Sequence, residues 1–85
     1  MRNDFEEIDV EEVKELTKTQ LKEIGKQVKK LRIEAGLTLN DVSFYTYLNL
    51  DSIYRLEKGR LDNVTLLTLM KLSIFYKKHV KDFFI

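Results

Sequence analysis

The sequence contains no cysteine and no proline, and it has one histidine and three glycines. The absence of cysteine excludes disulfide bonds, thiolate metal ligands and a cysteine nucleophile. A single histidine, His79, is too little for a multi-histidine metal site. Without proline and with few glycines, helices are favoured over strands joined by tight turns. We therefore expect an all-α fold that binds neither a metal nor a cofactor.

Long apolar runs are also missing, so we expect no membrane-spanning segment. The opening residues, MRNDFEEIDVEEVKEL, are acidic and lack the basic and apolar regions of a secretory signal, which predicts a cytoplasmic protein. The sequence has no glycine-rich phosphate loop and no grouping of nucleophile, histidine and carboxylate. We therefore expect a protein that is not an enzyme. Its 85 residues are enough for one domain.

The net charge of +1 conceals an uneven distribution. Residues 1–15 hold seven acidic and two basic residues, a net of −5, whereas residues 16–85 hold 13 basic and seven acidic residues, a net of +6. A basic body suits binding to phosphates, although an ordinary solvated surface has the same composition. We treat residues 1–18 as an acidic N-terminal arm or helix. It is interpreted as a disordered tail, a dimer arm, a partner-binding segment or a cover over the basic face.

Capping residues and apolar periodicity predict the first helix. Asp9 is the candidate N-cap, and apolar residues then recur every three or four positions. A second capping pattern at Thr17 either starts a separate helix or lies within one long helix. The amphipathic pattern ends near Ala35, with Gly36 as the residue after the helix.

Two short helices follow. Thr38 is the next N-cap and opens a helix to about Tyr47. Asn49 caps a helix from residue 50 to about residue 57, which Gly59 ends. The tight connection between them is typical of a helix-turn-helix unit, whose second helix fits the major groove of DNA.

A fourth helix is predicted from an N-cap at Asn63 to near Tyr76. Its expected inner face consists of Val64, Leu67, Met70 and Ile74. The tail HVKDFFI adds one helical turn with an apolar face formed by Val80, Phe83 and Phe84, and His79 is expected to lie at the surface or to cap it. The prediction is five helices, with an extra N-terminal helix if the first segment is divided.

The stretch from Leu37 to Arg60, LTLNDVSFYTYLNLDSIYRLEKGR, resembles the helix-turn-helix of the lambda-repressor-like family, of Cro or XRE type. The resemblance continues without a gap through residues 24–32 upstream and 64–72 downstream. It depends on an ordered set: Leu31-Arg32, Gly36-Leu37-Thr38, Ile53, Leu56-Glu57 and Gly59. It implies a five-helix lambda-repressor-like DNA-binding domain over residues 19–85, acting as a sequence-specific transcriptional regulator.

The resemblance also assigns roles to individual residues. The base-reading positions are Leu50, Asp51, Ser52 and Arg55, with Arg55 placed to contact guanine and Leu50 to contact a thymine methyl group. The phosphate-contacting positions are Thr38, Asn40, Asn49, Lys58 and Arg60. Arg32 and Glu57 form a structural salt bridge. The implied partners are double-stranded DNA and a second copy of the chain, through the N-terminal helix and the Phe83-Phe84-Ile85 end.

The sequence departs from the family pattern at three informative positions. Leu39 replaces a glutamine that grips the DNA backbone, and Asp51 brings negative charge to the base-reading face. Tyr47 replaces a turn glycine, so it needs a positive backbone angle or another turn geometry. These departures and the acidic arm motivate an alternative function: a protein-interaction module, or an antitoxin, with weak or no DNA affinity and a protein partner held by the arm.

Two structural interpretations remain open at this stage. Arg55 is four residues after Asp51, so the two can form a pair within the helix instead of reading a base. Tyr45, Tyr47 and Tyr54 can bind phosphates or stack on bases, but we expect them to be partly buried in the core.

Overall fold

The computed structural model describes residues 5–84, and the predictions for residues 1–4 and for Ile85 lie outside that part. The described residues form four α-helices and one 3-10 helix: α1 (Val10–Glu34), α2 (Leu39–Thr46), α3 (Leu50–Glu57), α4 (Leu66–Tyr76) and η1 (Val80–Phe83). The all-α fold is confirmed, whereas the count of five α-helices is not. None of these helices is long and apolar enough to cross a lipid bilayer.

Helix α1 is one continuous helix of 25 residues. Asp9 caps it by accepting hydrogen bonds from the backbone N–H groups of Glu11 and Glu12. The Thr17 hydroxyl donates to the Val13 carbonyl at 2.7 Å, as a mid-helix threonine does, so the interpretation of Thr17 as a new N-cap is wrong. The boundary predicted after residue 18 falls inside this helix.

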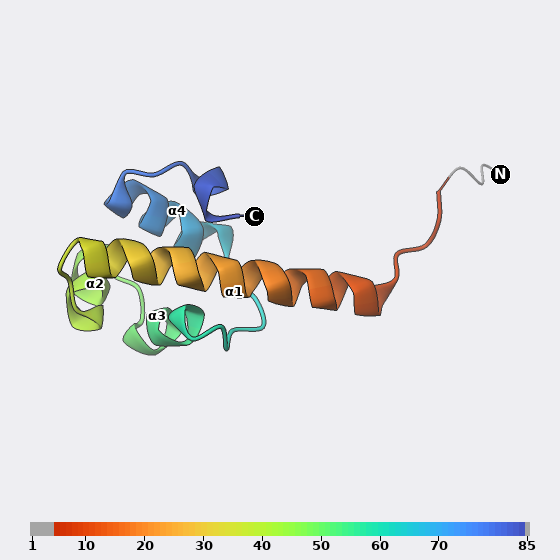
Figure 1. Ribbon diagram of the computed structural model, residues 1–85, viewed down its shortest axis with the longest axis horizontal. Coiled ribbons are helices and arrows are strands. Elements are labelled where there is room, and N and C mark those ends of the chain that lie inside the picture. The colour runs from red at the N-terminus through yellow and green to blue at the C-terminus, as the bar shows by residue number, and fades with distance from the viewer. Residues whose placement is uncertain (1–4, 85) are drawn as a thin grey trace.

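Only the second half of α1 packs against the rest of the molecule. Residues 10–19 are all exposed, and burial begins in the turn that contains Leu21. Figure 1 shows the first half of α1 and the segment before it projecting beyond the other helices. The helical part of the arm is therefore not a disordered tail, and in this structure residues 5–18 of the arm do not fold back over the body.

The core lies between α1 and the four later elements. Ile24 and Val28 of α1 are buried with side chains from each of those elements. The core residues are Ile24, Val28, Val42, Ile53, Leu56, Leu69, Leu72 and Phe83. A Cβ at Gly25 would collide with the backbone carbonyl of Leu56, so α1 and α3 approach at a distance that only glycine permits. This close contact fixes α3 on α1.

Helix α4 differs from its prediction. Its N-cap is Thr65 and not Asn63, and Leu69, Leu72 and Ser73 face the core. The predicted inner residues Leu67 and Ile74 are 66% and 72% exposed. The helix reads LLTLMKLSIFY, apolar on nearly every side, so its periodicity does not single out an inner face.

The C-terminal turn is a 3-10 helix capped by His79, whose Nδ1 accepts a hydrogen bond from the Lys81 N–H. This agrees with the predicted capping role of His79. Phe83 is buried in the core, while Phe84 remains about half exposed. The prediction of Phe83 as part of a dimer surface is therefore wrong, because the 3-10 turn directs its ring inward against α1 and α4.

Candidate nucleic-acid interface

Helix α2 begins with a reciprocal capping box. The Thr38 hydroxyl accepts from the Asp41 N–H at 3.1 Å, and the Asp41 carboxylate accepts from the Thr38 N–H at 2.8 Å. Hydrogen bonding to the Asp41 carboxylate, first from the Thr38 backbone N–H and then from the Thr38 side chain, holds the pKa of Asp41 below its ordinary value. The predicted cap is confirmed, and it leaves the remaining N–H groups at the start of α2 facing outward for an anion.

The turn between α2 and α3 is stabilised by polar side chains. Tyr47 adopts the left-handed conformation, with φ of 59°, so of the two alternatives left open for it the positive backbone angle is the one observed. The Ser43 hydroxyl donates to the Leu48 carbonyl at 2.6 Å, and the Thr46 hydroxyl accepts from the Leu48 N–H at 3.2 Å. Asn49 then caps α3 by accepting from the Ser52 N–H. These bonds fix the angle at which α3 leaves the turn.

Helix α3 is anchored at its far end by an ion pair. The Arg32 Nε donates to Glu57 Oε2 at 2.8 Å, and its second nitrogen donates to Oε1 at 2.9 Å. The third guanidinium nitrogen donates to the Leu37 carbonyl at 2.9 Å, which ties in the loop before α2. The side chains of Arg32 and Glu57 are 15% and 4% exposed. The pair predicted from the sequence thus joins α1, the loop before α2 and α3.

The charges of this pair affect a neighbouring tyrosine. The hydroxyl of Tyr76, on α4, is buried, and it has no hydrogen-bond partner among the described residues. Burial, and then the negative charge of Glu57, raise the pKa of Tyr76 to about 12. The hydrogen bonds to Glu57 also raise the pKa of Arg32. Arg32 and Tyr76 therefore each keep one protonation state at neutral pH.

The outer face of α3 carries the predicted base-reading residues. Leu50, Asp51, Ser52 and Arg55 are all exposed, while Ile53 and Leu56 on the opposite face are buried. The Arg55 Nε lies 3.6 Å from Asp51 Oδ2, so the predicted pair within the helix does form. Both side chains are more than half exposed, and such a pair contributes little stability. Arg55 can therefore leave Asp51 for a stronger acceptor.

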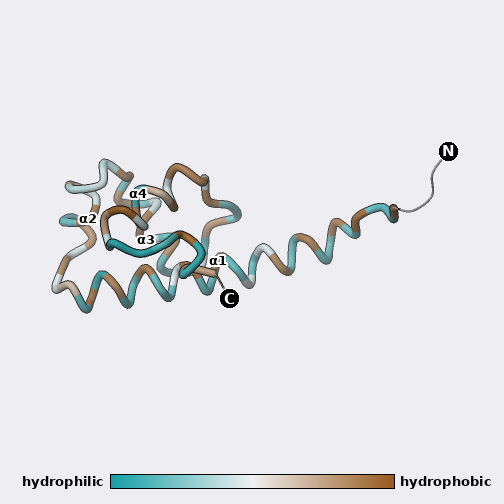
Figure 2. The backbone as a smooth tube through the Cα atoms, turned by 90° about the horizontal axis from the view of Figure 1, so that it is seen from above, coloured by the Kyte–Doolittle hydropathy of each residue, from teal (hydrophilic) through white to brown (hydrophobic). Residues whose placement is uncertain are grey.

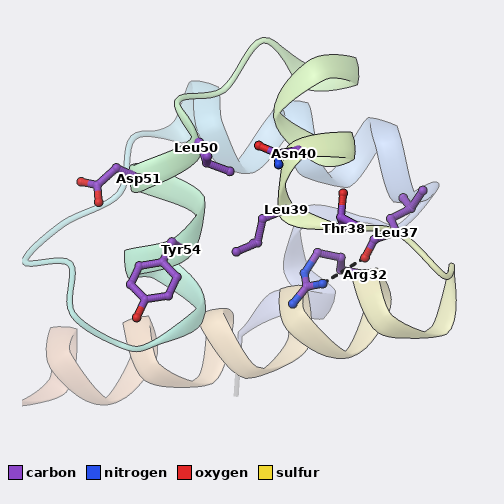
Figure 3. A pocket seen from close by; sticks show the side chains of 8 residues that line it. All are labelled: Arg32, Leu37, Thr38, Leu39, Asn40, Leu50, Asp51 and Tyr54. Atoms are coloured by element: carbon purple, nitrogen blue, oxygen red, sulfur yellow. Dashed lines mark hydrogen bonds between the residues drawn. The ribbon is translucent and has the colours of Figure 1, made fainter.

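A groove of about 530 Å³ separates the start of α2 from α3 (Figure 3). Its lining residues are Arg32, Leu37, Thr38, Leu39, Asn40, Leu50, Asp51 and Tyr54. It brings together two predicted phosphate-contacting residues, Thr38 and Asn40, and two predicted base-reading residues, Leu50 and Asp51. Leu39 points into the groove between the two helices. This leucine, one of the departures from the family pattern, therefore gives the face an apolar centre.

Other predicted residues lie away from this groove. Ser52 borders a different hollow, toward the start of α4, with Thr65 and Thr68. Lys58 and Arg60 follow the far end of α3 and are exposed. The Lys58 ammonium lies 5.7 Å from the centre of the Tyr54 ring, where a cation–π contact forms.

The aromatic residues were not placed correctly by sequence reasoning. Tyr45, Tyr47 and Tyr54 are all exposed, not partly buried in the core. Tyr45 stacks on Phe75 of α4 at a centroid distance of 5.9 Å, and Tyr54 lines the groove. Sequence reasoning named Leu39 and Tyr54 but did not place them with Leu37 in one groove. Leu37 and Leu39 flank the Thr38 cap, where apolar side chains commonly pack, whereas Tyr54 lies in the middle of α3.

Comparison with known proteins agrees with this geometry. The helix-turn-helix family model matches residues 28–83, which include all of α2, α3 and α4. The chain is similar to the restriction-modification controller protein C.AhdI from Aeromonas hydrophila, with a TM-score of 0.70 and 24% identity over 78% of this chain and 98% of that chain. No curated protein matches the sequence. Residues 1–27, with the projecting half of α1, lie outside the family match.

Proposed function

The chain belongs to the helix-turn-helix family, and on that premise we propose that it is a sequence-specific DNA-binding transcriptional regulator that acts by binding and not by catalysis. The observation that carries the proposal is an exposed α3 surface on a helix fixed by Gly25 and by the Arg32–Glu57 pair. A helix held in this way can enter the major groove without paying the entropy of ordering itself.

In the proposed complex α3 lies in the major groove. Arg55 exchanges its exposed pair with Asp51 for a bidentate contact to a guanine, and Leu50 meets a thymine methyl group. The N-termini of α2 and α3, capped by Thr38 and Asn49, present backbone N–H groups to phosphates. Asn40, at the rim of the groove, adds a side-chain contact to the backbone.

We further propose that the regulator binds as a homodimer, in the cytoplasm, to a two-fold symmetric site. Dimers of this kind place their recognition helices about 34 Å apart, one turn of DNA. A regulatory role agrees with the description of the similar solved structure as a controller protein.

Fluorescence anisotropy with a labelled random duplex tests DNA binding. We expect binding at low salt whose affinity falls as salt rises, because phosphate contacts release counterions. The double variant Lys58→Gln/Arg60→Gln should bind more weakly and with a smaller salt slope. Lys14→Gln, which removes a lysine from the projecting half of α1, is the matched control. It should leave the affinity for DNA and its dependence on salt unchanged.

Two results would contradict this proposal. One is no binding at low salt with tens of micromolar protein (~10⁻⁵ M), since nonspecific affinities of DNA-binding domains are typically about 10⁻⁴–10⁻⁶ M even at physiological salt. That result would favour the protein-interaction or antitoxin alternative. The other is an equal loss of affinity in the Lys14 control and the Lys58/Arg60 variant.

A further inference from the structure

The projecting half of α1 has an apolar surface that no other part of residues 5–84 covers. Val10, Val13 and Leu16 are 54%, 45% and 60% exposed. Figure 2 shows hydrophobic segments recurring along this part of the helix. An isolated helix of this length is only marginally stable in water, and its stability normally comes from packing an apolar face. A helix that continues for about ten exposed residues with a regular apolar stripe therefore indicates a contact surface.

Two hollows lie where α1 meets the body. One, of about 480 Å³, lies between the first half of α1 and the Leu61–Asp62 segment. The other, of about 350 Å³, lies between α1, Val64 and Phe84. Thr17 and Leu21 line both hollows, so a helix laid across Thr17 would reach both. The half-exposed ring of Phe84 forms one wall and would be covered by such a helix.

The charge along α1 changes sign near the same point. Residues 9–17 carry the acidic residues Asp9, Glu11, Glu12 and Glu15, against one lysine, Lys14, and the sign changes at Lys18. Residues 18–34 carry the basic residues Lys18, Lys22, Lys26, Lys29, Lys30 and Arg32, against Glu23 and Glu34. Two such helices side by side in antiparallel orientation would place acidic residues beside basic ones. A parallel pair would place like charges together.

We propose that this surface is covered by a second copy of the chain, through an antiparallel pair of α1 helices centred near Thr17. The positions Val10, Val13, Thr17 and Gln20 follow the 3-4-3 spacing of a coiled-coil seam. In the pair, Val10 and Val13 of each copy enter the hollows beside Leu21 of the other. This inference rests on the homodimer proposed above and specifies its interface, which lies outside the family match.

Disulfide trapping tests the orientation, and the chain has no native cysteine to interfere. In an antiparallel pair centred near Thr17, the two copies of that residue are neighbours. The two copies of Val10 are about 21 Å apart along the axis, far beyond disulfide reach. Under mild oxidation, we expect Thr17→Cys to form a covalent dimer on a non-reducing gel and Val10→Cys to remain uncoupled. Equal coupling of the two variants would indicate a parallel pair and overturn the proposal.

Sedimentation velocity of the full chain tests the surface itself. The wild type should sediment as a dimer, and Val13→Glu should shift to the monomer with an unchanged circular dichroism spectrum, because Val13 contacts no core residue. Ile74→Glu, at an exposed apolar position on α4, is the matched control and should remain dimeric. A monomeric wild type, a dimeric Val13→Glu or a monomeric Ile74→Glu would each overturn the proposal. These measurements use no DNA. If the chain binds DNA but fails them, the proposed interface is wrong and the proposed DNA-binding function still stands.

Discussion

Arg32 and Glu57 join three separate parts of the fold. Their two hydrogen bonds connect the second half of α1 to the end of α3, and a third bond from Arg32 holds the Leu37 carbonyl. The pair is mostly shielded from water, so its net stabilisation is modest, but either charge left alone would be costly. The pair therefore constrains the position of α3 more than it adds to the total stability.

Replacing Glu57 by alanine should destabilise the protein by about 3 kcal/mol, because it leaves the shielded Arg32 charge without a partner. Urea unfolding followed by circular dichroism measures this change. Glu34→Ala removes an exposed acid from the end of α1 and should change stability by less than about 0.5 kcal/mol. The double variant Arg32→Met/Glu57→Leu should recover most of the loss. A double variant as unstable as the single one would contradict this account.

Single-residue properties could be predicted where the family resemblance implies them. It implied the pairing of Arg32 with Glu57, and it gave the positive angle at Tyr47 as one of two alternatives. The exposure of Tyr45 and Tyr54 and the groove around Leu39 could not be predicted, because they depend on how two helices are spaced in three dimensions. A sequence pattern predicts which face of a helix is buried, but it does not predict the distance between that helix and its neighbour.

Among the helices, α2 and α3 begin where the sequence predicted. Thr38 and Asn49 begin their helices as expected, because a side-chain oxygen before a helical stretch satisfies N–H groups that have no other partner. Thr17 has the same residue pattern but lies inside α1, where its hydroxyl bonds to the preceding turn. The long amphipathic stripe on both sides of Thr17 outweighed the local capping signal.

Asp41 should make the stability of α2 depend on pH. Its pKa is lowered from 3.8 in the folded protein by hydrogen bonds from Thr38, so its stabilising effect is present above about pH 4 and is lost as the pH falls through the lower folded value. Thermal melting of the wild type and Asp41→Asn measures the effect. The wild type should melt at the higher temperature at neutral pH, and the difference between the two melting temperatures should close as the pH falls through the lowered pKa of Asp41 in the folded protein. A difference that stays constant with pH would exclude the charged cap as its source.

Over the whole molecule, the elongated shape separates acidic residues of the N-terminal arm from α3. The described part measures 55 × 22 × 20 Å, and its long dimension comes from α1 extending past a small body. This extension keeps the acidic residues 5–15 away from α3 in a single copy. The sequence indicated the uneven charge but not this separation, because the direction of the arm depends on whether α1 is interrupted.

Hydrogen exchange should divide α1 into two parts. In dilute solution, amides of residues 14–19 should exchange by local fraying, because their side chains are all exposed. Amides of residues 24–28 should exchange only with global unfolding. Mass spectrometry at two protein concentrations measures both, and the second group provides the internal control. Equal protection along all of α1 at the lower concentration would contradict this division.

The unbroken course of α1 from Thr17 to Gly25, where α3 packs, also has a consequence for the choice of operator. Each copy contributes about 12 Å of helical rise between those residues, so a pair joined at Thr17 separates its two α3 contacts by about 24 Å along the helix axis. Inserting one residue in this span would rotate each body by about 100° and disrupt the match to a two-fold DNA site. Inserting seven residues would nearly restore the relative orientation of the two bodies and would lengthen the span by about 10 Å in each copy. The number of residues in this segment would then determine how far apart two DNA half-sites must lie for one dimer to occupy both.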